Sequence, residues 1–327
     1  MVTLCRPASS SLLLPSRTLI VTLGLLLVSS AIHGVIGTFS DLFQPYWAPQ
    51  NIVLDKEEQA ELSLDTSSGE VLIYIHQLYL FINNGLYCWR LSGCGFESKK
   101  KYLFGLTSMQ IKLVQGDSAG TVTAFYMSSD GPTHDELDFE FLGNVSGEPY
   151  LVQTNVYANG TGNREQRHSL WFDPTKDFHT YSLFWNRRYI LFLVDGVPIR
   201  AFTNKEVKGI PYPKSQPMGV RVSVWNADDW VTQGGRVKTN WSHAPFVSTF
   251  RSFSIDACEL LEDSSAGADS TARCGESGQF WWDRPAFQEL DGHRSRQLRW
   301  VQKKHLVYDY CQDNLRFSVQ LPGECIS

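Results

Sequence analysis

Residues 134–144 read HDELDFEFLGN and place Glu136, Asp138 and Glu140 at alternate positions. Side chains two residues apart on a β-strand project from the same face, so the three carboxyls would share one face and the apolar residues between them would face the core. At a rise of about 3.3 Å per residue, the Cα atoms of the two glutamates would lie about 13 Å apart. On a concave sheet the side chains can lean together, toward the ~5–5.5 Å spacing of retaining glycosidases.

Crowding three acids is unfavourable because like charges raise one another's pKa. Cleavage of a glycosidic bond can use such raised pKa values. It needs one ionised carboxylate to attack the anomeric carbon and a second, protonated carboxyl to release the leaving sugar. An aspartate between them can hydrogen-bond the nucleophile and help to keep the two roles apart. The alternative is an exposed polar strand face, although such faces usually mix charges of both signs. The motif therefore favours catalysis at a glycosidic bond.

The elements that must position this strand are also strands. From about residue 100 to 257, short β-branched and aromatic runs are separated by turn residues, among them the Asp195-Gly196 pair. Strands at this spacing, without helical patterns or repeats between them, predict an antiparallel β-sandwich. The predicted strands are SMQIKLV, TVTAFYM, LDFEFLG, YLVQTNVYA, YSLFWN, YILFLVDG, MGVRVSVW and TFRSFSI.

The chain changes character after Cys258. The stretch ELLEDSSAGADSTARCGESG is polar and small-residue-rich and predicts a loop, whereas FQELDGHRSRQLRWVQKKHLVYDYCQD is partly helical. We expect this tail to be an appendage stapled to the sandwich and not an independent core.

The N-terminus has the pattern of a secretory signal peptide. Arg6 and Arg17 precede the apolar run LIVTLGLLLVSSAIHGVIG, which ends in small residues, so we expect cleavage between Ala31 and Gly37. The alternative is a membrane anchor, but the uninterrupted apolar core is short for a span of ~20 residues. Three sequons, at Asn144, Asn159 and Asn240, agree with export.

Export would favour disulfides. Six cysteines remain if Cys5 leaves with the signal, and six allow 15 connectivities; they are Cys88, Cys94, Cys258, Cys274, Cys311 and Cys325.

Composition and motifs limit which kinds of ligand and partner the protein can have. The net charge of −5 and pI of about 5.9 argue against a nucleic-acid partner, and 43% hydrophobic residues suffice for a sizeable core. No HExxH or paired CxxC motif is present, so we expect no metal site and no cofactor. Aromatics can stack on sugar rings or pack in the core; the candidates for stacking are Tyr126, Trp225, Trp230 and Trp241, with Trp230 favoured because Asp228 and Asp229 precede it.

The 134–144 motif resembles the active-site strand of the xyloglucan endotransglucosylase/hydrolases. These plant cell-wall enzymes belong to glycoside hydrolase family sixteen. The likeness covers nearly the whole mature chain, including SGCGFESKKKYLFG, GDSAGTVTAFYMSSD, VQTNVYANGTGNREQR, WFDPTKDFHTYSLFWN, QPMGVRVSVWNADDWVTQGG and HLVYDYCQD. It implies a curved antiparallel, concanavalin-like jelly roll over residues 38–257, after a signal peptide over 1–37 and before a C-terminal extension over 258–327.

The resemblance also implies residue roles. Glu136 would be the nucleophile, Glu140 the acid/base and Asp138 the residue that tunes both, with a glycan on Asn144. The implied disulfides are Cys258–Cys274 and Cys311–Cys325. The implied substrate contacts are Gln153, Thr154, Asn155, Asn163, Arg164, Glu165, Asp229, Trp230, Gly234 and, as a weaker match, Arg299.

The activity that the resemblance implies is cleavage of internal β-1,4 bonds of xyloglucan and transfer of the chain to another xyloglucan end. The enzyme would be secreted to the cell wall and apoplast, monomeric, and free of the membrane after signal removal. The short VKTNWSHAPF loop looks more like the transferases than the hydrolases. The alternatives are hydrolysis of xyloglucan or of another β-glucan, and a lectin-like sandwich without chemistry.

Residues 69–91, GEVLIYIHQLYLFINNGLYCWRL, depart from the family, whose pattern runs almost directly from ELSLDTSS into SGCGF. The segment is too short, and too interrupted by His76 and Gln77, for a membrane span, and it is too apolar for a surface loop. Its composition is typical of translated AT-rich noncoding sequence, so we interpret it as a retained intron or gene-model error. A genuine insertion would be an aggregation risk and would bring Cys88 near Cys94.

We expect the mature transcript to lack the codons for residues 69–91, which sequencing of the transcript will check. A peptide containing Tyr79 in the secreted protein would contradict this interpretation.

Overall fold

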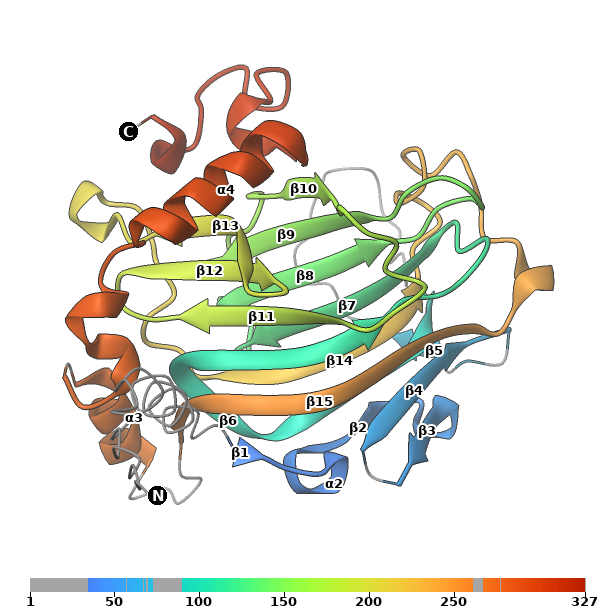
Figure 1. Ribbon diagram of the computed structural model, residues 1–327, viewed down its shortest axis with the longest axis horizontal. Helices are drawn as coiled ribbons and strands as arrows, with labels where there is room; N and C mark the ends of the chain where they lie inside the picture. Colours follow the sequence, from blue (N-terminus) through green and yellow to red (C-terminus); the bar gives the residue numbers. More distant parts are fainter. Residues whose placement is uncertain are drawn as a thin grey trace, which may run out of the picture. The chain divides into compact units, whose positions relative to one another are not determined.

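The computed structural model describes residues 35–326 except 57, 67, 69, 73–89, 261–266 and 277 (Figure 1). The expected signal sequence up to residue 34, and most of the atypical 69–91 segment, lie outside the described residues. In the part that is described, no helix is long and apolar enough to cross a membrane.

One layer of strands carries the three acids on its outer face. Its central strands are β7 (Thr121–Ser128), β8 (Glu136–Leu142) and β9 (Leu151–Tyr157), and every neighbouring pair is antiparallel. The layer continues on one side through β10 (Gln166–Ser169) to β16 (Leu306–Asp309), and on the other through β14 (Met218–Asn226) and the first half of β6 (Arg90–Lys112) to β2 (Phe43–Trp47).

The second layer packs against the inner face of the first. In spatial order it contains β13 (Val197–Thr203), β12 (Tyr189–Val194), β11 (His179–Trp185), the second half of β6, β15 (Phe246–Glu259), β4 (Gln59–Leu64) and β3 (Ile52–Asp55). Two short strands join the sandwich: β1 (Val35–Ile36) pairs with β15 of the second layer, and β5 (Glu70–Leu72) pairs with the start of β6, in its first half. The predicted antiparallel sandwich is confirmed.

Strand β6 belongs to both layers because its backbone bends at Phe104 and Gly105. Both have positive φ, 66° and 130°, and a Cβ on Gly105 would lie 2.4 Å from Ala257 Cα. Only glycine can take this conformation at so close an approach. The sequence predicted a strand over 108–114 alone, because the preceding residues of β6 include three lysines and three glycines that obscure the alternation.

Aromatic rings from both layers form the core beneath β8. Phe139 stands 5.2 Å from the Phe192 ring of β12 and 5.8 Å from the Tyr181 ring of β11, measured between centroids. Phe139 has no exposed surface. Because side chains alternate along a strand, burial of Phe139 and its apolar neighbours directs the three acids to the opposite face. Hydrophobic packing therefore decides which way the charged side chains point.

Part of the predicted loop after Cys258 is a helix, so that prediction is wrong for α3 (Gly267–Gly275). Its sequence is a weak helix former, and short helices depend on tertiary contacts. A disulfide joins Cys274 to Cys258, and the Arg187 guanidinium donates to the Cys274 carbonyl at 3.1 Å. These contacts satisfy the helix end, which local sequence could not reveal.

The C-terminal tail completes the first layer, so it is more than an appendage. Helix α4 (Gly292–Lys304) contacts β13 (Figure 1). It leads into β16, which pairs with β10. The disulfide Cys311–Cys325 closes the end of the tail. Both disulfides implied by the resemblance are thus present, whereas Cys94 is a buried free thiol.

A buried ion pair holds the tail to the sandwich. Glu324 accepts from Arg164 Nε at 2.5 Å, and the two side chains are only 9% and 8% exposed. Arg164 also donates to the Val156 carbonyl at 3.2 Å.

We expect Glu324→Ala to lower the free energy of unfolding by about 3–5 kcal/mol, because the buried Arg164 charge loses its partner. Urea denaturation will measure the change. Lys176→Ala is the matched control, since its pair with Asp173 spans 3.5 Å at an exposed site and such pairs contribute little. Equal effects of the two substitutions would contradict the assignment.

Candidate active site

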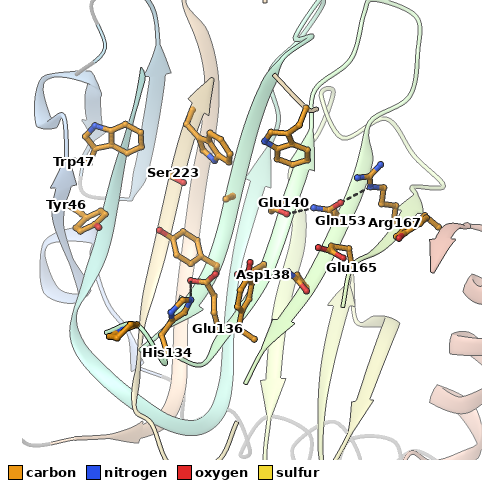
Figure 2. Close-up of a pocket in the computed structure, with 18 of the residues that line it drawn as sticks. Tyr46, Trp47, His134, Glu136, Asp138, Glu140, Gln153, Glu165, Arg167 and Ser223 are labelled. Carbon is orange, nitrogen blue, oxygen red and sulfur yellow. Dashed lines mark hydrogen bonds and ion pairs between the residues drawn. The ribbon is translucent and has the colours of Figure 1, made fainter. Parts of the chain in front are cut away.

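A cleft of about 1130 Å³ lies over the outer face of β7, β8 and β9. Glu136, Asp138 and Glu140 line its floor in a row (Figure 2). The register places Glu136 opposite Ser128 on β7 and Glu140 opposite Gln153 on β9. Strand pairing thus arranges polar partners beside each acid.

Glu140 is held by a chain of hydrogen bonds. Gln153 Nε2 donates to Glu140 Oε2 at 2.6 Å, and Arg167 Nε donates to Gln153 Oε1 at 2.7 Å (Figure 2). Burial raises the pKa of Glu140 to about 7, and the negative charges of Glu136 and Glu165 also raise it, while Gln153 and Arg167 oppose the rise. A carboxyl with this pKa can give up and take back a proton near neutral pH.

Asp138 is the more strongly perturbed acid. Burial raises its pKa well above the usual range, and the charges of Glu136 and Glu140 add to the effect. The protonated Asp138 carboxyl hydrogen-bonds Glu136, which stabilises negative charge on Glu136. Asp138 and Glu140 therefore both have raised pKa values, the shift being the stronger at Asp138.

His134 flanks Glu136 at the start of β8. Its Nε2 lies 3.9 Å from Glu136 Oε2, and its Nδ1 lies 3.2 Å from the Gly131 carbonyl. The imidazole stacks on Tyr157 with 5.3 Å between centroids. The histidine thus packs against its neighbours in the fold and also lies beside the Glu136 carboxyl.

Aromatic side chains line both ends of the cleft, as a sugar polymer requires. Tyr46 and Trp47 come from β2 (Figure 2). A Cβ on Gly93 would lie 2.5 Å from the Trp47 ring, so glycine there lets the indole lie on β6. The other lining aromatics are Tyr126, Tyr157, Trp225, Trp230 and Tyr308.

Three of the four aromatic candidates therefore line the cleft, but Trp241 does not. Its ring packs 6.0 Å from Phe246 against the hydrophobic core. Core packing, the alternative considered for each aromatic, applies to Trp241.

Of the predicted substrate contacts, the structure places Gln153, Asn155, Glu165 and Trp230 on the cleft with the three acids. Asn155 Oδ1 accepts from the Arg164 backbone N–H at 3.0 Å, which orients its amide. These residues come from strands or segments far apart in sequence, and only the sheet brings them together.

The other predicted contacts are not among the cleft-lining residues. Thr154 is fully buried on the inner face, where its hydroxyl accepts from Arg200 at 3.0 Å. Arg164 is buried in the ion pair with Glu324. Strand alternation sends Thr154 inward, so it cannot meet a sugar in the cleft.

The remaining four predicted contacts lie in loops or on a helix. Asn163 accepts from Arg316 Nη2 at 2.8 Å. Asp229 and Gly234 belong to the segment that carries Trp230, and Arg299 is exposed on α4.

The tail supplies a cleft residue that the sequence argument missed. Arg316 donates to Glu165 Oε2 at 2.6 Å and to Asn163 at 2.8 Å, and it lines the cleft. Tyr308 and Asp313 line it too, joined by a 2.8 Å hydrogen bond. The tail motif HLVYDYCQD contained Tyr308, but nothing in the spacing showed that the tail reaches the cleft.

Asn144, the predicted glycan site, lies two residues after the end of β8 and is half-buried. Its Nδ2 donates to the Pro149 carbonyl at 3.1 Å, and its Oδ1 accepts from the Val145 N–H at 3.0 Å. Glycosylation there stays a prediction.

Comparisons with known proteins agree with this geometry. Residues 39–243 match the family described as Glycosyl hydrolases family 16, and residues 276–325 match "Xyloglucan endo-transglycosylase (XET) C-terminus". The chain is 56% identical to Xyloglucan endotransglucosylase protein 6 of Diospyros kaki over 97% of its own length and 98% of the relative's. It is 52% identical to Xyloglucan endotransglucosylase/hydrolase protein 9 of Arabidopsis thaliana over 92% and 93% of the two chains.

A solved structure shares the fold. A prokaryotic β-1,3-1,4-glucanase (lichenase) from a mouse hindgut metagenome superposes with a TM-score of 0.50 at 22% identity, over 69% of this chain and 97% of that one. The fold and site define a β-sandwich glycoside hydrolase. The chain belongs to glycosyl hydrolase family 16 and, within it, to the xyloglucan endotransglucosylase/hydrolases.

We expect Glu140→Gln to stabilise the protein above pH 7 by up to about 3 kcal/mol. The pKa of Glu140 is raised from 4.5 to about 7 on folding, so its contribution to stability is complete below pH 4.5 and is lost as the pH rises through 7. Denaturation at pH 5 and pH 8 will measure the change, which should be present at pH 8 and small at pH 5. The exposed Glu148→Gln should change neither value, and a pH-independent effect of Glu140→Gln would contradict the assignment.

Proposed function

We propose that this protein is a retaining xyloglucan endotransglucosylase that remodels plant cell wall. The observation that carries the proposal is the row of three carboxyls, those of Glu136, Asp138 and Glu140, on the floor of an aromatic-lined cleft. Membership of the xyloglucan endotransglucosylase/hydrolases supports xyloglucan as the donor and the acceptor. Asp138 has a strongly raised pKa and Glu140 a pKa of about 7, which suits a site that must hold a nucleophile beside an acid.

The first half-reaction cleaves the donor. A Glu136 carboxylate oxygen forms a bond to the anomeric carbon of an internal glucose while the glycosidic C–O bond breaks. Glu140 gives its proton to the departing oxygen, so the leaving chain departs as a neutral alcohol with a new 4-hydroxyl. Protonated Asp138 donates a hydrogen bond to Glu136; its proton stays on Asp138, and the hydrogen bond weakens as the ester forms and the Glu136 carboxylate loses its charge. The products are a glycosyl-Glu136 ester and a free chain end.

The second half-reaction joins a new acceptor. Glu140, now ionised, takes the proton of an incoming xyloglucan hydroxyl, whose oxygen attacks the anomeric carbon. The ester bond breaks and the Glu136 carboxylate returns. Two inversions give overall retention. Water in place of the sugar hydroxyl would give hydrolysis.

The cleft supports binding of a long glucan across the strands. Aromatic faces at Trp47, Trp225 and Trp230 suit the apolar faces of sugar rings, and the amides of Gln153 and Asn155 suit their hydroxyls. Such contacts along an extended chain suit attack at internal bonds.

Export to the cell wall is part of the proposal. The signal-like N-terminus, the sequons and the two disulfides support secretion to the apoplast as a glycoprotein carrying a glycan on Asn144. We propose that the mature chain is a monomer that is free of the membrane, with a catalytic sandwich over 38–257 and an extension over 258–327.

The test incubates the purified protein with xyloglucan polymer and a labelled xyloglucan oligosaccharide. We expect label to enter polymer with few new reducing ends. New ends without label would indicate a hydrolase, and label or new ends obtained only with another β-glucan would overturn the substrate assignment.

In the same assay, we expect Glu136→Ala to abolish transfer, because no glycosyl ester can form. Retained binding of polymer will show that the variant is folded. If neither the parent nor the variant is active but both bind polymer, the protein is a glucan-binding sandwich and the proposal fails.

A further inference from the structure

Four side chains on neighbouring strands form a row that begins at Glu140, the proposed acid/base. Glu140 on β8 pairs with Gln153 on β9, Gln153 pairs with Arg167 on β10, and Arg167 pairs with Tyr308 on β16. The first three are linked by the hydrogen bonds of 2.6 and 2.7 Å (Figure 2). The Arg167 guanidinium lies 5.5 Å from the Tyr308 ring centroid. The row thus runs from the cleft floor to the tail.

The amide of Gln153 could in principle face either way. A guanidinium has only donors, so Arg167 requires an acceptor and fixes Gln153 Oε1 toward itself. Gln153 Nε2 is then left to face Glu140, where it donates to Oε2. A donor at Oε2 leaves no acceptor there for a carboxylic O–H. The proton of neutral Glu140 is therefore directed to the other oxygen, Oε1.

We propose that Arg167 is a positioning residue that fixes the Gln153 amide and thereby determines which oxygen of Glu140 carries the proton. This inference rests on the proposed acid/base role of Glu140. Without Arg167 the amide can turn over and present its carbonyl to Glu140 Oε2, which would then bind the proton on the wrong oxygen. The fraction of enzyme with a proton available to the leaving group falls.

Electrostatics agree with this arrangement. The charged groups that act on the pKa of Glu140 are Glu136 on its own strand, Glu165 directly before β10, and the cation Arg167. Glu140 in turn raises the pKa of Asp138, and the facing residue of β7 is Ala124. Tyr157 on β9 is affected by the charge of Glu140 in turn. Arg167 lowers the pKa of Glu140, so its removal should also move the alkaline limit of donor cleavage upward.

Tyr308 extends the row into the C-terminal extension. Its ring packs beside Arg167, and its hydroxyl donates to Asp313 at 2.8 Å. The extension therefore lines the cleft and also contacts Glu140 indirectly, through Arg167 and Gln153.

The experiment compares two donors in wild type and Arg167→Met. One donor is xyloglucan polymer, whose leaving group needs a proton; the other is a xyloglucan oligosaccharide with a dinitrophenyl leaving group, which does not. We expect kcat/KM for the polymer to fall about tenfold, with less than about a threefold change in aryl release. We also expect the alkaline limb of the polymer profile to move to higher pH. Arg167→Lys should restore much of the loss, because one N–H donor suffices.

Two further variants separate positioning from binding. Arg316→Met removes another cleft cation outside the row, and it should affect both donors by the same factor. In a Gln153→Leu background, Arg167→Met should no longer change the ratio of the two donors, since no amide remains to turn over. An equal loss on both donors in Arg167→Met, or an undiminished effect in the Gln153→Leu background, would overturn the proposal.

The proposed function is tested separately by the wild-type protein. Glu140→Ala should lose polymer cleavage about 10²- to 10⁴-fold while releasing the aryl group. A wild type that acts on neither donor refutes the function, whereas an active wild type with an unchanged donor ratio in a folded Arg167→Met refutes the positioning role alone. Thermal unfolding monitors folding, and Arg167→Leu, which also removes the donor to Gln153, replaces Arg167→Met as the test if the latter does not fold, with a donor ratio shifted in the same direction expected and an unchanged ratio overturning the role.

Discussion

The repulsion among three carboxyls on β8 is the constraint on which the rest of the site depends. Placing like charges at alternate positions is unfavourable, and burial makes it more so. The protein resolves the conflict by protonating part of the set: Asp138 has a strongly raised pKa, and Glu140 titrates at about 7. One strand can therefore carry both a nucleophile and a general acid.

Packing on the opposite face makes this arrangement tolerable. Phe139 and its apolar neighbours are clamped between the layers by the rings of Tyr181 and Phe192, so β8 cannot rotate to release the acids to solvent. A charged row that could relax would lose its raised pKa values. The hydrophobic core thus maintains an electrostatic arrangement that is itself unfavourable, as is common where function sets the requirement.

The C-terminal tail stabilises one edge of the same cleft. Glu324 neutralises buried Arg164, whose backbone N–H orients Asn155. Arg316 forms a second ion pair with Glu165, the residue that follows Arg164. The 163–165 turn is therefore held by two ion pairs from one disulfide-closed segment. This explains why a tail with few core residues of its own is bound so specifically to the cleft edge.

The sequence by itself determined the identity and common face of Glu136, Asp138 and Glu140, because strand alternation is a local property with a period of two. It also determined the all-β class and, through resemblance, the two disulfide pairs. Tertiary structure decided what local patterns do not encode. It turned Thr154 into the core, folded residues 267–275 into a helix around Cys274, and brought Arg316 to the cleft in place of Arg299. Each of these depends on contacts between segments far apart in the chain, and periodicity carries no information about such contacts.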